Sequence, residues 1–339
     1  MTKNKNSLLH TSVLVNETIN FLSINKNHLY IDGTFGDGGH SKAILEKNKT
    51  CKVFAIDRDP DVLERGKFFE KKYKKRFKLI LGRISNLEKI LNKQKIRKVN
   101  GVFFDLGVST RQIQDPKRGF SFQKKGPLDM RMEKKGTTAE DFLNAQEKVE
   151  ELANIIFAFG EERKSRKIAK AIIEYKKNKK IKTTIELANI IQSVKGLKKR
   201  GIHPSTKTFQ AIRIYINNEL EEIKKGLIAT KNILTKGGRL VVISFHSLED
   251  RIVKSFFNLC SSLKKNPSRY LPIKEYTPGL FRSISRKPLV ADVKEIKQNI
   301  RSRSAKLRYA VRNSNSFFYP TEFKKKFVSY LKLEGSRSW

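Results

Sequence analysis

The stretch LYIDGTFGDGGHSKAIL, residues 29–45, decides the fold. A short apolar run ends at Asp32, a glycine-rich loop follows, and a helical pattern begins at Ser41. Glycines are needed where the backbone turns sharply and lets a ligand approach within contact distance. The stretch therefore predicts the first strand, loop and helix of a βαβ unit, with a nucleotide-containing cofactor at the loop.

An acid at the end of the next apolar run strengthens this interpretation. Asp57 closes the run that starts at Val53, and in this fold an acid there accepts hydrogen bonds from ribose hydroxyls. The loop lacks the third glycine of the dinucleotide fingerprint G-x-G-x-x-G. Asp32 at its start suits instead a cofactor that carries a positive ammonium group. A tight turn without a cofactor is the alternative for the loop alone, and Asp57 makes that alternative weaker.

Further apolar runs extend the predicted sheet and then stop. Phe77 to Leu81 and Val102 to Asp105 continue the parallel pattern, and strand character returns only at Gly238 to Phe245, after a turn at Lys236 to Gly238. Asp105, at a strand end, is a candidate for contacting cofactor or substrate, with a turn or helix cap as the alternative.

The intervening residues have helical patterns. Thr183 and Glu186 have the spacing of a capping box, and apolar residues from Phe209 to Leu227 form one long amphipathic face. We expect an α/β fold in which a helical domain interrupts the sheet. The expected domains are 1–110 with 213–313 for the cofactor-binding sheet, 111–212 for the inserted helical domain, and 314–339 for a basic and aromatic extension.

The charge balance indicates a polyanionic partner. The chain has 73 Lys and Arg against 33 Asp and Glu, a net charge of +40. This excess is larger than solubility requires, although a coding bias toward lysine is an alternative source of part of it. On charge alone, RNA, DNA and an anionic membrane all remain open.

Cysteine usage argues against a disulfide framework and against a zinc site. Cys51 and Cys260 lie far apart in the sequence and form no short metal-ligand spacing. The first residues lack the apolar core of a secretory signal, and no apolar run approaches the roughly 18 residues of a membrane span. We expect a cytoplasmic protein with no metal and no membrane partner.

Several phrases resemble one family closely, the ribosomal small-subunit methyltransferase H family, which makes N4-methylcytidine in the decoding centre. Together these phrases cover nearly all of residues 8–312, in one order. They are HTSVLVNE from His10, YIDGTFGDGGHS from Tyr30, AIDRDP from Ala55, DLGVST from Asp105 with Gln112, RGFSF from Arg118, GPLDMRM from Gly126, GEER from Gly160, HPSTKTFQAIRIYIN from His203, and ISFHSLEDRIVK from Ile243.

The resemblance implies a class I, Rossmann-like methyltransferase sheet with an inserted all-helical substrate-recognition domain. It implies S-adenosylmethionine as cofactor and 16S rRNA of the small ribosomal subunit as substrate; the oligomeric state is left open, with a homodimer as one option. Position 84 is commonly Phe in the family, and Ile here replaces an aromatic contact to the adenine. The family's cofactor contacts fall on Gly38, Gly39, His40, Asp57, Ile84, Asp105 and Gln112.

Methyl transfer from a sulfonium is a direct displacement, so it needs alignment and exclusion of water. A hydrogen-bond acceptor on the amine would help the nitrogen to react and could accept the released proton. Asp105 is one candidate, although the Pro-Pro that follows such an acid in related amino-methylating enzymes is missing. Ser109 and His246 are alternative acceptors or substrate positioners, and a structural, hydrogen-bonded histidine is an equal alternative for His246.

Four residues near the start of the predicted insert are candidates for the substrate pocket or the RNA contact: Arg118, Phe120, Phe122 and Arg131. A small core beneath the insert is an equal alternative for the phenylalanines. Methylation at C5 of cytosine would need a cysteine nucleophile. Neither Cys51 nor Cys260 follows a strand at the ligand edge, which favours methylation of nitrogen. A non-catalytic RNA-binding protein and a DNA methyltransferase are the rival functions.

Overall fold

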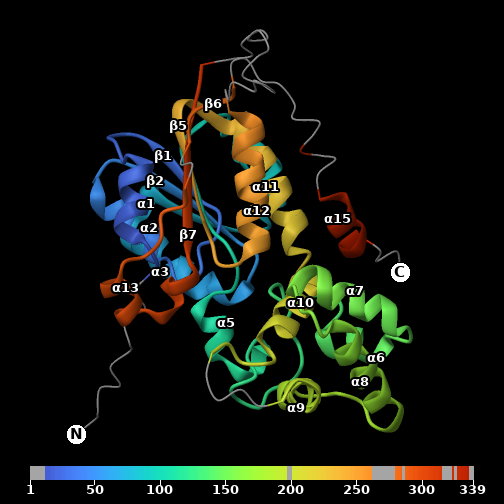
Figure 1. Ribbon diagram of the computed structural model, residues 1–339. Helices are drawn as coiled ribbons and strands as arrows, with labels where there is room; N and C mark the ends of the chain where they lie inside the picture. Colours follow the sequence, from blue (N-terminus) through green and yellow to red (C-terminus); the bar gives the residue numbers. More distant parts are fainter. Residues whose placement is uncertain are drawn as a thin grey trace, which may run out of the picture. The chain divides into compact units, whose positions relative to one another are not determined.

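The computed structural model describes residues 12–196, 201–261, 279–284, 287–314, 323 and 327–335. These residues fall into two compact units (Figure 1). The first contains the described residues up to Gly107 and from Glu222 to Phe323, and the second contains Val108–Glu221 with 327–335. The boundary that the sequence suggests at 212–213 lies inside a helix. Among the described residues, no helix has both the length and the apolar character needed to cross a membrane.

The first unit contains a seven-stranded sheet in the order β3-β2-β1-β4-β5-β7-β6. Strands β1 to β5 run parallel to their neighbours, and β7 is antiparallel to both β5 and β6. This is the strand order of class I methyltransferases, and it confirms the predicted fold class. The strands are β1 (Leu29–Asp32), β2 (Lys52–Asp57), β3 (Phe77–Leu81), β4 (Val99–Asp105), β5 (Leu234–Ser244), β6 (Phe281–Ile284) and β7 (Lys306–Arg312).

Strand β5 begins earlier than the sequence suggested. The predicted turn at Lys236 to Gly238 lies inside the strand, where the register with β4 shifts between Val99 and Gly101. Gly237 has a φ of 76°, which glycine adopts without strain. The extra residues of β5 therefore form an irregularity in the sheet, and pairing resumes on both sides of it.

Helices cover the sheet of the first unit because their apolar residues recur at helical spacing. Ile19 and Leu22 of α1, Ile44 and Leu45 of α2, and Phe69 of α3 join one buried cluster with strand residues such as Phe103. Each such side chain contributes about 1.5–3 kcal/mol when buried. The helices are α1 (Val15–Leu22), α2 (Gly39–Lys47), α3 (Leu63–Tyr73), α4 (Leu87–Lys93), α11 (Glu219–Ile233), α12 (Ser247–Cys260) and α13 (Val293–Gln298).

The second unit is helical in its described part. Thr183 caps the helix that follows it, with Glu186 completing a capping box, as predicted. The single long amphipathic face expected from Phe209 to Leu227 is wrong, because Asn218 has a left-handed φ of 49° and separates two helices. The helices are α5 (Thr110–Gln114), α6 (Ala139–Ala145), α7 (Val149–Gly160), α8 (Ser165–Asn178), α9 (Thr184–Lys195), α10 (Thr206–Asn217) and α15 (Val328–Gly335).

Helix α15 supplies the cap of a helix far from it in the sequence. The buried carboxylate of Glu334 accepts hydrogen bonds from the backbone N–H groups of Leu220 (3.1 Å) and Glu221 (2.9 Å) in the first turn of α11. Burial raises the pKa of Glu334 to about 8. Leu220 and Glu221, at the start of α11, belong to the second unit, so the described end of the chain is a packed part of that unit.

Candidate functional site

Three neighbouring strands of the first unit each end in an aspartate. Asp32 closes β1, Asp57 closes β2 and Asp105 closes β4. Because these strands are parallel and β1 pairs with both β2 and β4, the three acids share the carboxyl edge of the sheet. Ligands of open α/β sheets bind at this edge, where the strand order reverses.

Asp32 organises the glycine loop. Its side chain is fully buried, and its two oxygens accept hydrogen bonds from the Thr34 N–H (3.2 Å) and the Ser41 hydroxyl (2.6 Å). Burial raises its pKa to about 6. The sequence suggested that Asp32 suits an ammonium group, but the structure commits its oxygens to the loop. Because Asp32 has no exposed surface, its charge can act on a ligand, whereas direct contact falls to other groups.

The loop itself forms a close-fitting cradle. Gly38 has a φ of 80° and is the N-cap of α2, and a Cβ there would lie 2.6 Å from the Phe69 ring. A Cβ on Gly39 would overlap the Ser12 hydroxyl. Among the described residues, no side chain forms a cap hydrogen bond at the N-cap Gly38, and the positive end of α2 suits an anionic group such as a carboxylate. These positions need glycine for both backbone conformation and space.

Asp57 ties the end of β2 to the same loop. Its carboxylate accepts hydrogen bonds from the N–H groups of Gly36 (2.7 Å) and Asp59 (2.9 Å). Burial raises its pKa to about 6. A carboxylate has roughly four lone-pair positions, so Asp57 retains capacity for hydroxyl donors of a ligand.

Asp105 differs because one of its oxygens is buried without a partner. The described part of the chain offers its Oδ1 no hydrogen-bond donor, and its Oδ2 lies 3.7 Å from His40 Nδ1. Its pKa is raised well above the ordinary value by burial, and then by the negative charges of Asp32 and Glu249. Its side chain as a whole is still 27% exposed although Oδ1 is buried, so a ligand can approach the residue.

His40 is held in one orientation beside Asp105. Its Nε2 donates a hydrogen bond to the carbonyl of Val13 (2.9 Å), and its ring centroid lies 4.4 Å from that of Phe103. Its Nδ1 is the atom that faces Asp105. Two residues that the sequence assigned separately to the cofactor site are therefore neighbours.

Ile84, the other cofactor candidate of this unit, begins the turn after β3 and is 9% exposed. A Cβ on Gly226 of α11 would lie 3.1 Å from its side chain. Ile84 is therefore an aliphatic wall packed against α11, where an aromatic side chain would need more room.

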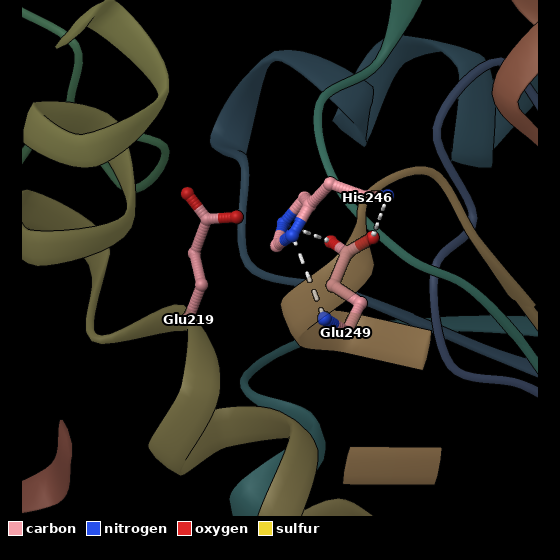
Figure 2. A group of neighbouring side chains, drawn as sticks. All are labelled: Glu219, His246 and Glu249. Atoms are coloured by element: carbon pink, nitrogen blue, oxygen red, sulfur yellow. Dashed lines mark hydrogen bonds and ion pairs between the residues drawn. The ribbon is translucent and has the colours of Figure 1, made fainter. Parts of the chain in front are cut away.

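His246 caps helix α12 together with Glu249, as Figure 2 shows. His246 Nδ1 accepts a hydrogen bond from the Glu249 N–H (3.4 Å), and Nε2 lies 3.1 Å from Glu249 Oε1. The other oxygen of the buried Glu249 accepts from the N–H of Phe245 (2.7 Å). Both ring nitrogens face one glutamate, which supports the structural alternative for His246. Glu249 was not predicted from the sequence, although its spacing from His246 is that of a capping box.

Ser109 and Gln112, in the second unit, form another capping box. The Ser109 hydroxyl accepts from the Gln112 N–H (3.2 Å), and the Gln112 side chain accepts from the Ser109 N–H (2.9 Å). Both residues thus define the start of α5. The Ser109 hydroxyl is engaged in this cap, which weakens its case as a catalytic acceptor.

The substrate candidates of the second unit have mainly structural contacts. Arg118 is 5% exposed and donates to the carbonyls of Arg131 and Met132 (both 2.9 Å), and Arg131 pairs with Asp129 (2.7 Å). The ring of Phe122 stacks on His203 with centroids 4.3 Å apart. Phe120 lies 5.8 Å from the Arg118 guanidinium. The burial of Arg118 and the packing of Phe122 favour a local core, the alternative that the sequence left open.

Neither cysteine is a reactive thiolate. The Cys51 thiol is buried before β2 and donates to the carbonyl of Ile44 (3.4 Å), and burial raises its pKa. Burial also raises the pKa of Cys260, at the end of α12, to about 12. Both thiols stay protonated at neutral pH, so they are poor nucleophiles.

Comparison with known proteins gives one consistent result. The chain is 46% identical over 307 residues to the ribosomal RNA small subunit methyltransferase H of Paramagnetospirillum magneticum, covering 90% of this chain and 96% of the relative. It is 48% identical over 303 residues to the protein of the same name from Rickettsia africae, covering 89% and 97%. The MraW methylase family matches residues 7–313. This chain belongs to the MraW methylase family.

Proposed function

We propose that this protein transfers a methyl group from S-adenosylmethionine to N4 of a cytidine in 16S rRNA of the small ribosomal subunit. Its curated relatives carry the name ribosomal RNA small subunit methyltransferase H. The observation that carries the chemistry is Asp105, whose buried Oδ1 lacks a donor in the described chain at the ligand edge of the sheet. A bound ligand or substrate amine can supply that donor.

The residues at the edge fit the cofactor. The N-terminus of α2 suits its carboxylate, and Asp57 suits its ribose hydroxyls. The buried acid Asp32 provides negative charge for its ammonium and sulfonium groups. When bound, the cofactor supplies a methyl group that is already electrophilic, so the displacement needs no metal.

Asp105 is the residue that we assign to the amine. The lone pair of a cytosine amine is delocalised into the ring, and a carboxylate that accepts its hydrogens favours a pyramidal, more nucleophilic nitrogen. Burial raises the pKa of Asp105, so this residue stays protonated at a higher pH than an exposed acid does. A positive charge bound beside it would favour the carboxylate form, which can accept a hydrogen bond and then a proton.

Charge and domain organisation support RNA as the substrate. The net charge of +40 suits a polyanion, and the second unit is inserted between strands β4 and β5 of the cofactor-binding sheet. We assign substrate recognition to this unit and a cytoplasmic location to the protein, where ribosomal subunits are assembled.

The direct test uses small subunits from a strain that lacks this gene. Purified protein and S-adenosylmethionine should produce N4-methylcytidine in these subunits, read by nucleoside mass spectrometry. A variant in which a short linker replaces residues 108–221 should retain part of the cofactor affinity and lose rRNA methylation. Appearance of 5-methylcytidine, or no methylated nucleoside with folded, cofactor-binding protein, would contradict the proposal.

A further inference from the structure

Helix α3 presents two different faces. Gly66, Phe69 and Tyr73 are buried, and Phe69 and Tyr73 belong to the apolar cluster on the sheet. On the opposite side, Phe68 is 53% exposed. Basic residues of α3 lie one turn before it and one turn after it, and all are exposed. We call Arg65, Phe68, Lys71 and Lys72 the α3 outer face.

The α3 outer face remains positive after its local acids are counted. Glu64 shares this side of the helix, and Lys72 lies 3.6 Å from Glu46. Both partners in that ion pair are about half exposed, so the pair contributes little and leaves Lys72 available to another anion. Three cations against these two acids give a surface that attracts a polyanion.

Phe68 adds a second property that charge does not explain. A single exposed apolar side chain is common and by itself identifies nothing. Here the ring lies among cations, with the Arg65 guanidinium 5.4 Å from its centroid. Proteins that hold single-stranded nucleic acids combine positive charge for the backbone with exposed aromatic rings on which bases stack. The α3 outer face has both parts of that combination.

The position of this face connects it with the cofactor loop. Arg65 Nε donates a hydrogen bond to the carbonyl of Asp37, which lies in the glycine loop (3.2 Å). Helix α3 also follows Asp57, the acid at the end of β2, through one short turn at Pro60–Val62. The α3 outer face therefore begins beside the cofactor site, within the same unit.

We propose that the α3 outer face docks a single-stranded segment of the RNA substrate, with a base stacked on Phe68 and phosphates on the surrounding cations. This inference rests on the proposed function, because that function supplies an RNA substrate. It adds a docking surface on the cofactor-binding unit to the recognition that we assign to the inserted unit.

The test separates stacking from charge by using two probes, a single-stranded oligoribonucleotide and inorganic polyphosphate. Phe68→Ala should weaken oligoribonucleotide binding about 5-fold to 100-fold, the range for loss of one stacked base. It should leave polyphosphate binding unchanged. Lys71→Gln with Lys72→Gln should weaken both probes and reduce the salt dependence, by roughly 0.7 in log–log slope for each lost phosphate contact.

Phe157→Ala is the matched control. Phe157 is 59% exposed on α7, and its neighbours one turn away, Ala153, Asn154, Gly160 and Glu161, carry no positive charge. It should bind both probes as the unaltered protein does. Melting temperature and S-adenosylmethionine affinity, measured on each variant, should stay unchanged.

Three results would overturn the docking surface. The first is that Phe68→Ala binds the oligoribonucleotide as well as the unaltered protein does. The second is that Phe68→Ala loses polyphosphate binding to the same extent as oligoribonucleotide binding. The third is that Phe157→Ala loses as much oligoribonucleotide binding as Phe68→Ala does. Loss of binding to anionic vesicles with RNA binding retained would assign the face to a membrane and also overturn it. Methylation of small subunits is read separately. A failure there, with the binding results as expected, would reject the proposed function and leave the docking surface standing.

Discussion

Strands β2 and β4 both end in an aspartate, but the two carboxyl groups differ in their hydrogen bonds. Asp57 accepts hydrogen bonds from two backbone N–H groups, whereas Asp105 Oδ1 is buried and has no donor in the described chain. A buried polar atom without a partner costs about 1–3 kcal/mol. Asp57 thus fixes the loop and has lone pairs left for a ligand, whereas Asp105 Oδ1 has only a ligand to supply its donor. The comparison predicts that loss of Asp57 impairs binding and that loss of Asp105 impairs the chemistry.

The largest effect is expected for Asp105→Asn. An amide has nearly the same shape, but it is a much weaker acceptor and cannot take a proton at neutral pH. We expect the rate of methyl transfer to fall about 100-fold or more, the usual contribution of acid–base groups. The rate at saturating substrates and the cofactor affinity should be measured on the same protein. A normal rate with weakened cofactor binding would make Asp105 a cofactor contact only and remove the contrast with Asp57.

Asp57→Ala should have the next largest effect, and on binding. A hydrogen bond between a carboxylate and a hydroxyl is worth about 1.5–3 kcal/mol, which is roughly 10-fold to 100-fold in affinity. Calorimetry with S-adenosylmethionine checks this, and the melting temperature is the control because Asp57 also holds Gly36. Unchanged affinity would contradict the assignment of the ribose to Asp57.

Acidification should weaken cofactor binding more modestly. The pKa values of Asp32 and Asp57 are raised to about 6, so both acids are ionised at pH 7 and become protonated below pH 6. A positively charged cofactor prefers the ionised form, and its affinity should fall as the pH decreases through 6. The cofactor affinity can fall by at most about 10-fold per pH unit for each acid. Adenosine has the ribose but no charge, so its affinity should fall less over the same range, through Asp57 alone. An affinity for S-adenosylmethionine that stays level from pH 7 to 5 would refute this coupling.

The smallest effect is expected for Cys51→Ser combined with Cys260→Ser. Both thiols are buried and have raised pKa values, and direct displacement on nitrogen needs no thiolate. Most of the activity should remain, although placing hydroxyls in buried sites should lower the melting temperature. Complete inactivity of a folded, cofactor-binding double variant would show that the chemistry does not depend on the carboxylates alone.

The sequence was most informative where the chemistry follows a local pattern. Asp57 and Asp105 could be placed at the ligand edge because strand ends are visible as apolar runs that stop at an acid. The glycine loop could be placed because Gly38 and Gly39 precede a helical pattern. In each case a few adjacent residues determine the feature.

The sequence was least informative where a side chain is used by a distant or unusual partner. The burial of Arg118 depends on carbonyls of Arg131 and Met132, which no periodicity reveals. His246 as a helix cap was missed because Ser, Thr, Asp and Asn are the residues expected there. The break at Asn218 was missed because the apolar spacing continues across it. Only the left-handed backbone conformation of Asn218 ends the helix there.

The cap that Glu334 provides for α11 has a consequence for how the chain is made. Leu220 and Glu221 emerge from a ribosome more than a hundred residues before the carboxylate that accepts their N–H groups. At about 5–20 residues per second, this interval lasts roughly 6 to 23 s. Throughout that time the first turn of α11 must satisfy its amides with water. Completion of this helix is therefore one of the last events in the biosynthesis of the molecule, after every strand of the sheet has been synthesised.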